Sequence, residues 1–224
     1  MTTEVKQVAV LGGGSFGTSI ANILADNGHR VMLWMRNAET VRNIATQNEN
    51  TQYLPGKKLN PSIQPTTSLQ DAVSSSDLLF VAIPSKAFKQ VVTQAAQWLD
   101  DSKMLVSTTK GIEMDGFRLM SQILEDCTPC SKIGVLSGPN LAKEIAERTL
   151  TGSVIASEYG VVRQTVQDTL SCNYFRVYAN SDRFGVELGG ALKNIYAIAS
   201  GMAAATPTEM ASCPMPLNHL LILP

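Results

Sequence analysis

A single lysine lies in an otherwise small and apolar stretch, GGALKNIYAIASGMAAA, at residues 189–205. Between residues 184 and 205 the only charged residues are Glu187 and Lys193. The apolar positions recur at helical spacing, so we expect a helix with one core-facing side, formed by Leu188, Leu192, Ile195 and Ala199. Lys193 adjoins this side. It is either a lysine whose stem packs while its amine reaches water, or a desolvated lysine that exchanges protons near neutral pH.

Two polar loops could meet this lysine. The segment STTKGIE (107–113) places Lys110 just beyond an expected strand, and GPNLAKE (138–144) places Gly138 and Asn140 in a turn after the next strand. In an open α/β sheet, ligands bind at the edge where the strands end. A second cation at Lys110 would favour the neutral amine of Lys193. Taken alone, each loop is more simply a surface lysine or an ordinary turn.

A glycine-rich turn near the start of the chain has the spacing of a phosphate-binding loop. In VAVLGGGSFGTSIA (8–21) a G-x-G-x-x-G pattern follows an expected strand and opens a helix. Such glycines allow a tight turn, close backbone approach to a pyrophosphate, and close helix packing; here they are Gly12, Gly14 and Gly17. We expect the backbone N–H groups of Ser15 and Phe16 to face the phosphates. The alternative is a turn that binds no ligand.

The end of the second expected strand indicates which dinucleotide would bind. Arg36 stands there, where a site selective for NAD often has an acidic residue that binds the ribose 2′-hydroxyl. A guanidinium suits a 2′-phosphate. The sequence therefore favours NADP(H), with NAD(H) possible; the alternative is a solvent-exposed arginine that tolerates either cofactor.

Apolar runs alternate with helical patterns along the chain. We expect strands at 8–12, 30–35, 77–84, 104–111, 133–139, 152–157 and 174–179, and helices at 16–28, 38–48, 86–98, 117–125 and 160–170. The ranges 77–84, 104–111 and 133–139 include the turn residues on which these strands close. A polar loop with Pro55, Gly56, Pro61 and Pro65 follows the second helix. This order predicts an α/β fold with a doubly wound parallel sheet over residues 1–182. The helix at 184–205 would open a second domain, residues 183–224.

Composition and charge exclude several other classes of protein. The 224 residues carry a net charge of −1, with no basic cluster that would bind nucleic acid. The apolar runs are too short to span a bilayer, and MTTEVKQ at the start has no targeting core, so we expect a cytoplasmic protein. Cys127 and Cys130 form a C-x-x-C that could be a redox pair, although it follows a helix instead of preceding one. No metal site is expected.

These features together resemble the bacterial NAD(P)-dependent glycerol-3-phosphate dehydrogenases over residues 5 to about 205. The shared motifs occur in the same order and are GGGSFGTSIA, the Arg36 strand end, VAIPS, STTKGIE, LSGPNLAKEIA and VELGGALKNIYAIASGMAAA. The resemblance implies a Rossmann-type fold and interconversion of sn-glycerol 3-phosphate and dihydroxyacetone phosphate with NAD(P)(H), which supplies phospholipid synthesis. It implies cofactor contacts at Ser15, Phe16, Arg36, Lys110 and Ala142, and substrate contacts at Lys110, Gly138, Asn140 and Lys193. Lys193 would be the proton acceptor and donor, with Asn194 beside it.

The chain departs from that family after residue 205. Its last 19 residues, TPTEMASCPMPLNHLLILP, contain four prolines, no glycine and no helical period. We therefore expect an irregular tail from about residue 206, an incomplete all-α domain, and a sequence that resembles a truncated or frameshifted product. Such a chain would bind a dinucleotide through residues 8–145 but reduce the triose phosphate poorly. The exposed helix would invite aggregation or a homodimer. The alternatives are a non-catalytic dinucleotide-binding remnant and another NAD(P)-dependent hydroxyacid reductase.

Overall fold

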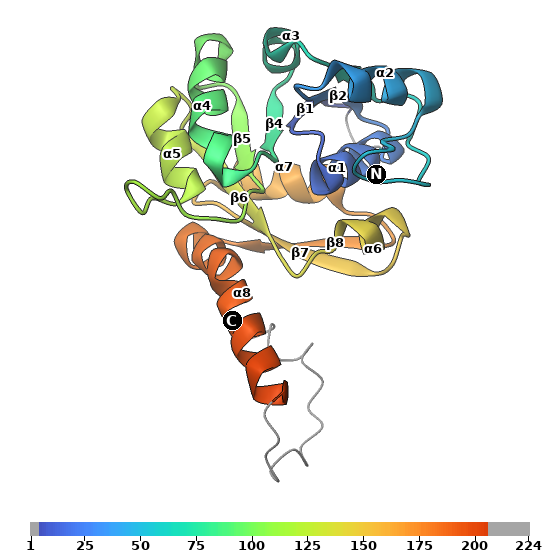
Figure 1. Ribbon diagram of the computed structural model, residues 1–224. Coiled ribbons are helices and arrows are strands. Elements are labelled where there is room, and N and C mark those ends of the chain that lie inside the picture. Colours follow the sequence, from blue (N-terminus) through green and yellow to red (C-terminus); the bar gives the residue numbers. More distant parts are fainter. Residues whose placement is uncertain (1–4, 206–224) are drawn as a thin grey trace.

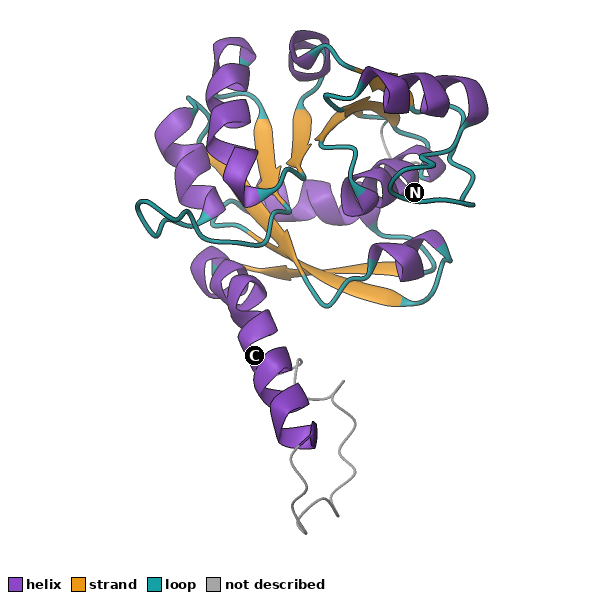
Figure 2. Cartoon of the chain, in the orientation of Figure 1, coloured by secondary structure: helices purple, strands orange, loops and turns teal. Residues whose placement is uncertain are grey.

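The computed structural model describes residues 5–205, apart from the side chains of Asn194 and Ala205. Its centre is one eight-stranded sheet with helices on both sides (Figures 1 and 2). The strand order is β3-β2-β1-β4-β5-β6-β7-β8. Only the β6–β7 pair is antiparallel among these strands. The strands are β1 (Gln7–Leu11), β2 (Arg30–Trp34), β3 (Gln64–Thr66), β4 (Leu78–Val81), β5 (Met104–Ser107), β6 (Lys132–Ser137), β7 (Thr151–Ala156) and β8 (Phe175–Asn180).

The helices divide between the two faces of the sheet. Side chains alternate along β1, so Val8 and Val10 join one core while Ala9 and Leu11 join the other. The first core includes residues of α1 (Ser15–Asp26), α2 (Ala38–Gln47), α6 (Ala142–Ala146) and α7 (Gly160–Leu170). The second includes residues of α3 (Leu69–Ser74), α4 (Ser85–Ala95) and α5 (Met120–Cys127). A short 3-10 turn, η1 (Ala96–Trp98), extends α4. The doubly wound α/β fold is thus confirmed.

Two elements were missed in the segment expected to be a polar loop. β3 is a three-residue strand at the edge of the sheet and contains Pro65, which an edge strand tolerates because its N–H side need not pair. α3 begins where the Ser68 side chain accepts a hydrogen bond from the Asp71 N–H. Both elements are too short to show a period in sequence.

The last described helix, α8 (Arg183–Ala205), runs away from the body of the protein (Figure 1). Leu188 and Leu192 are half-buried, but Ile195 and Ala199 are exposed. The expectation that this whole side is core is therefore wrong beyond Leu192, because the first part of α8 lies against the sheet and the rest extends away from it (Figure 1). In residues 5–205, no helix combines the length and apolar character needed to cross a membrane.

Candidate functional site

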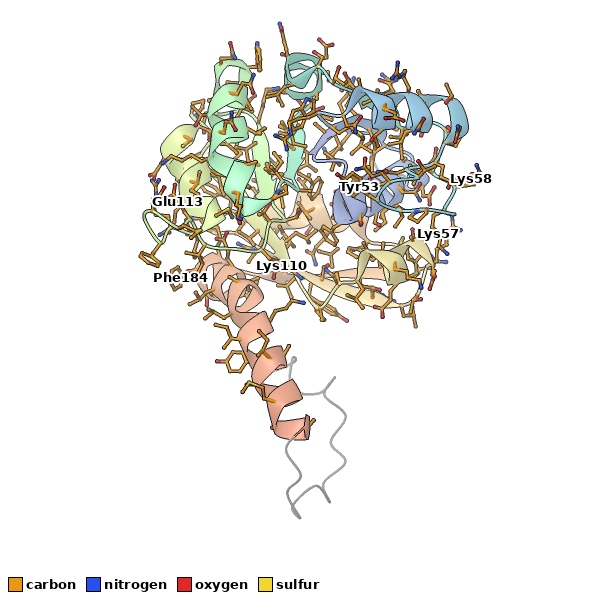
Figure 3. All side chains as sticks on the ribbon, in the orientation of Figure 1. Tyr53, Lys57, Lys58, Lys110, Glu113 and Phe184 are labelled. Carbon is orange, nitrogen blue, oxygen red and sulfur yellow. The ribbon has the colours of Figure 1, made fainter. Side chains whose placement is uncertain are left out.

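A cleft of about 480 Å³ opens where the strand order reverses. β2 lies on one side of β1 and β4 on the other, so the loops that follow these strands diverge and leave a crevice at their carboxyl ends. Figure 3 places Tyr53 beside α1, on the wall of this cleft, and Lys110 near the start of α8. The lining also includes Gly12, Gly14, Ser15, Phe16, Gly17, Met35, Arg36, Ala82, Pro84 and Thr109.

The glycine-rich turn forms the floor of the cleft, and its geometry requires glycine at two positions. Gly12 has φ of +127°, and a Cβ there would lie 2.2 Å from the Ala82 carbonyl oxygen. A Cβ on Gly17 would lie 2.0 Å from the Gly12 oxygen. In contrast, a Cβ on Gly14 would have no neighbour within 4 Å. The turn is therefore packed tightly against β4 and α1 but open at Gly14, where a ligand can approach the backbone.

The start of α1 is suited to an anion. Gly14 occupies the N-cap position and supplies no side-chain cap, and the first turn contains no acidic residue. The uncapped N–H groups and the helix dipole therefore place positive potential at this end of the cleft. Of the described residues that line the cleft, the charged ones are Arg36 and Lys110, both cationic. Arg36 is exposed at the end of β2.

Lys110 and Lys193 meet beside the cleft. The Lys110 Nζ donates to the Gly138 carbonyl at 2.9 Å, and the Lys193 side chain lies close enough to Lys110 to perturb its pKa. Although Lys110 as a whole is exposed, burial of its ammonium group and then the charge of Lys193 lower the pKa of Lys110 to about 8. Lys193 itself is half-buried. The structure therefore joins two loops and a helix that are distant in sequence.

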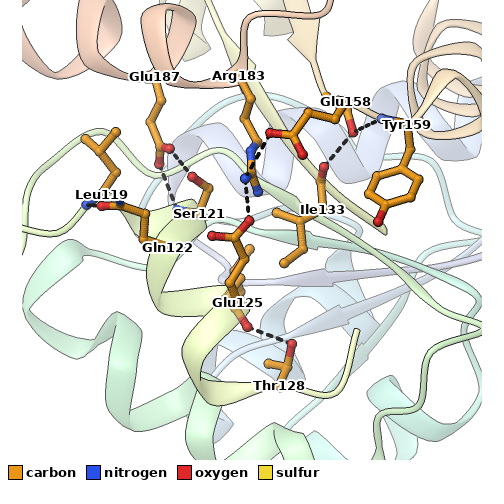
Figure 4. A network of polar contacts seen from close by, with 12 residues as sticks. Leu119, Ser121, Gln122, Glu125, Thr128, Ile133, Glu158, Tyr159, Arg183 and Glu187 are labelled. Atoms are coloured by element: carbon orange, nitrogen blue, oxygen red, sulfur yellow. Dashed lines mark hydrogen bonds and ion pairs between the residues drawn. The ribbon is translucent and has the colours of Figure 1, made fainter. Parts of the chain in front are cut away.

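Polar contacts hold the first turns of α8, the helix that carries Lys193, against α5 (Figure 4). The buried carboxylate of Glu187 accepts hydrogen bonds from the N–H of Ser121, at 3.0 Å, and from its hydroxyl. Burial raises the pKa of Glu187, opposed by these bonds from Ser121. Arg183 pairs with Glu125 and with Glu158.

Among the small residues at the start of α8, Gly190 lies close to a side chain of β6. A Cβ on Gly190 would lie 2.3 Å from the Ser137 hydroxyl oxygen, so a larger residue there would require the Ser137 side chain to rotate or the helix to shift. Gly189, in contrast, faces open space.

Hydrogen bonds and ion pairs of Glu113 hold the loop that carries Lys110. The Glu113 carboxylate accepts two hydrogen bonds from the Arg118 guanidinium, at 2.7 and 3.1 Å, and pairs with Lys89 at 3.1 Å. These cations lower the pKa of Glu113, with Arg118 the larger cause. The loop therefore returns on itself between Ile112 and Leu119.

The other residues expected at the site lie around this cluster. The Asn140 side chain is buried and donates to the Ser153 hydroxyl, while its Oδ1 is buried without a hydrogen-bond partner. Ala142 begins α6, and its carbonyl accepts a hydrogen bond from the Ser19 hydroxyl. Asn194 follows Lys193 along α8, and its side chain lies outside the described part.

The cysteine pair does not have the environment of a redox site. Cys127 and Cys130 are both free, and Cys130 is buried with its thiol donating to the Asp100 carbonyl. Burial raises the pKa of Cys130, whereas a reactive thiol needs a lowered pKa.

Sequence reasoning missed the contribution of residues 48–60 to the cleft. This segment was expected to be a polar loop, but Tyr53 lines the cleft and Asn50 is fully buried beneath the glycine turn. The segment has no apolar period, so its packing against α1 could not be read from the pattern.

Comparisons with known proteins agree with this geometry. A family model described as the N-terminus of NAD-dependent glycerol-3-phosphate dehydrogenase matches residues 7–161, and the C-terminus model matches residues 182–211. A glycerol-3-phosphate dehydrogenase [NAD(P)+] of Alcanivorax borkumensis is 58% identical over 205 residues, which are 92% of this chain and 60% of that protein. One from Azotobacter vinelandii is 60% identical over 200 residues, covering 89% of this chain and 58% of that protein.

A solved structure also matches. The crystal structure of glycerol-3-phosphate dehydrogenase from Coxiella burnetii superposes with a TM-score of 0.84 at 32% identity, covering 89% of this chain and 61% of that one. The chain thus spans about 60% of the length of the relatives that it matches.

Proposed function

Since the chain belongs to the family of NAD-dependent glycerol-3-phosphate dehydrogenases, we propose that its reaction is the interconversion of sn-glycerol 3-phosphate and dihydroxyacetone phosphate. The observation that carries this proposal is the meeting of Lys110 and Lys193 beside a cleft that begins at the glycine turn. An anionic triose phosphate would be attracted by two cations, and its carbonyl oxygen would lie within reach of an amine. Supply of glycerol 3-phosphate to phospholipid synthesis is part of the proposal.

The cofactor is proposed to be NADP(H), with NAD(H) accepted less well. The described part of the cleft fits a dinucleotide because Gly14 is open to approach and the uncapped start of α1 attracts a pyrophosphate. Ser15 and Phe16 would contact these phosphates. Arg36 at the end of β2 would pair with the 2′-phosphate of the adenosine ribose. Lys110 and Ala142 are proposed as further cofactor contacts.

Lys193 and Lys110 have different proposed roles at the reacting carbonyl. When bound, the nicotinamide ring supplies the hydride to C2 of the substrate in the direction of reduction. Lys193 would donate a proton to the C2 oxygen, and its neutral amine would accept that proton in the reverse direction. Lys110, held on the Gly138 carbonyl, would stabilise negative charge that develops on the oxygen. Gly138, Asn140 and Asn194 are proposed to shape the substrate end of the site.

The organisation of the chain and its setting are further parts of the proposal. A division into a dinucleotide-binding domain, residues 1–182, and a helical substrate domain, residues 183–224, is supported by the start of α8 at Arg183. A homodimer is supported by apolar side chains on α8 that are 61% to 68% exposed, namely Ile195, Tyr196, Ile198 and Met202. We place the protein in the cytoplasm.

Titration and substrate profiling test the proposal. Quenching of protein fluorescence should show saturable binding of NADPH, and of NADH with lower affinity. The consumption of NADPH at 340 nm should then depend on dihydroxyacetone phosphate and not on a 2-oxo acid such as ketopantoate. Absence of NADPH binding would overturn the cofactor assignment. Preference for the 2-oxo acid would replace the proposed reaction with that of a hydroxyacid reductase.

A further inference from the structure

Residues 48–60 form a strap across α1, between the end of α2 and β3. The strap is tied to α1 at both ends. The Ser15 hydroxyl donates to the Tyr53 carbonyl at 2.7 Å, and the Asn60 N–H donates to the Asn22 side chain at 2.7 Å. Two strap leucines, Leu54 and Leu59, are buried in the adjacent core. The strap therefore has a defined position relative to the glycine turn.

Asn50 connects the strap to the glycine-rich turn, and both polar atoms of its side-chain amide make hydrogen bonds. Its Nδ2 donates to the Gly13 carbonyl at 2.9 Å and to the Thr18 hydroxyl at 2.8 Å. Its Oδ1 accepts from the Tyr53 N–H at 3.2 Å. The Thr18 hydroxyl also reaches the Gly13 carbonyl, at 3.3 Å. Asn50 is fully buried, so these bonds are shielded from water.

These bonds fix the direction of one peptide group. In a trans peptide, the carbonyl oxygen and the N–H of the next residue point in opposite directions. The Gly13 oxygen faces Asn50 and Thr18, which both donate to it. The Gly14 N–H therefore points away from these two side chains, toward the cleft that Gly14 lines. Glycines flank this peptide on both sides, so no side chain restricts its rotation. A reversed peptide would present a carbonyl oxygen to an anionic ligand.

We propose that Asn50 is a positioning residue for the dinucleotide phosphates. It holds the Gly13–Gly14 peptide so that a hydrogen-bond donor faces the phosphates, and it places Tyr53 on the cleft wall. The inference rests on the proposed function for the identity of the ligand. It goes beyond that function because Asn50 itself is buried and touches neither cofactor nor substrate.

The test compares Asn50→Asp with Asn60→Ala, using NADPH as the probe. Asn50→Asp keeps the shape and the acceptor for Tyr53 but removes both donors, so the Kd for NADPH should rise about tenfold or more, equivalent to about 1.4 kcal/mol. Asn60→Ala removes a hydrogen bond to Asp26 at the far end of the strap. It should lower the melting temperature and leave the Kd within twofold of the wild type.

A second readout follows the peptide directly. In ¹H–¹⁵N NMR spectra, the Gly14 amide proton should move downfield when NADPH is added to the wild type and to Asn60→Ala, but not in Asn50→Asp. An Asn50→Asp variant with wild-type affinity and the same Gly14 response would overturn the inference and leave the proposed function intact. A wild type that binds no NADPH would overturn both.

Thr18→Val provides a second test if Asn50→Asp does not fold. It removes the other donor to the Gly13 carbonyl while keeping the side-chain volume, so we expect a smaller rise in the Kd, about threefold. An unchanged Kd with an unchanged Gly14 response in Thr18→Val would also contradict the proposal that these hydrogen bonds fix the Gly13–Gly14 peptide.

Discussion

Replacing Lys193 with methionine should raise the pKa of Lys110. Methionine keeps an unbranched apolar stem but removes the charge. Two causes lower the pKa of Lys110 from the ordinary lysine value of 10.5 to about 8: burial first, and then the charge and hydrogen bonding of Lys193. Lys193→Met removes the second cause and leaves burial. The pKa of Lys110 should therefore rise but remain below 10.5.

The expected size of the rise is about 1, the lower end of what a neighbouring charge contributes. A lysine with a pKa of about 8 is about half neutral at pH 8, and one with a pKa of about 9 is roughly one-tenth neutral. Only the neutral amine reacts with acetic anhydride. The labelling rate of Lys110 at pH 8 should therefore fall about fivefold in Lys193→Met.

Competitive labelling between pH 6.5 and 11, quantified on the peptide that contains Lys110, measures this titration. Lys58→Met is the matched control because Lys58 pairs with Glu49 on a part of the surface distant from Lys110 (Figure 3). That variant should leave the Lys110 titration unchanged. A Lys110 pKa that stays near 8 in Lys193→Met would refute the coupling between the two lysines.

Three other predictions concern stability and cofactor choice. Burial lowers the pKa of His29, whose Nδ1 accepts a hydrogen bond from the Lys6 N–H, so the unfolded chain binds a proton more readily. The free energy of unfolding in urea should therefore be fully retained above pH 6.5 and fall as the pH drops below it. In His29→Gln this fall should be shallower. Equal pH slopes of the unfolding free energy in both proteins would contradict this. Arg36→Ala should raise the Kd for NADPH about tenfold while changing that for NADH little, as measured by fluorescence titration; an equal loss for both cofactors would remove Arg36 from 2′-phosphate recognition. Glu187→Ala leaves the Ser121 N–H and hydroxyl without their buried acceptor, so urea unfolding should show a free energy of unfolding lower by about 1.5–3 kcal/mol. Glu187→Gln keeps an acceptor and should lose less stability. A wild-type free energy of unfolding in Glu187→Ala would show that this contact does not hold α8.

Much of the dinucleotide-binding fold could be predicted because its strands are continuous apolar runs that end in turn residues. The glycine turn, Arg36 and Lys110 follow directly from such strands, so their places at one edge of the sheet could be inferred. β3 and α3 could not, since three and six residues are too few to show a period.

The remaining parts of the site depend on contacts between distant segments. Asn50 and the glycine turn are 37 residues apart, and Ser121 and Glu187 are 66 apart. Nothing in the local sequence marks either pair. The core-facing side expected on α8 fails beyond Leu192 for a related reason: spacing shows that one side of a helix is apolar, but only tertiary contacts decide whether that side is covered.

Transfer of deuterium from NADPH labelled at the reactive C4 position to dihydroxyacetone phosphate tests the central claim most directly. Long incubation followed by mass spectrometry detects even slow turnover. The account predicts glycerol 3-phosphate with one deuterium at C2, formed by the wild type and reduced by orders of magnitude in Lys193→Met, with NADPH binding retained in both. Deuterated product formed at the same rate by Lys193→Met, or none from a wild type that binds NADPH, would contradict it.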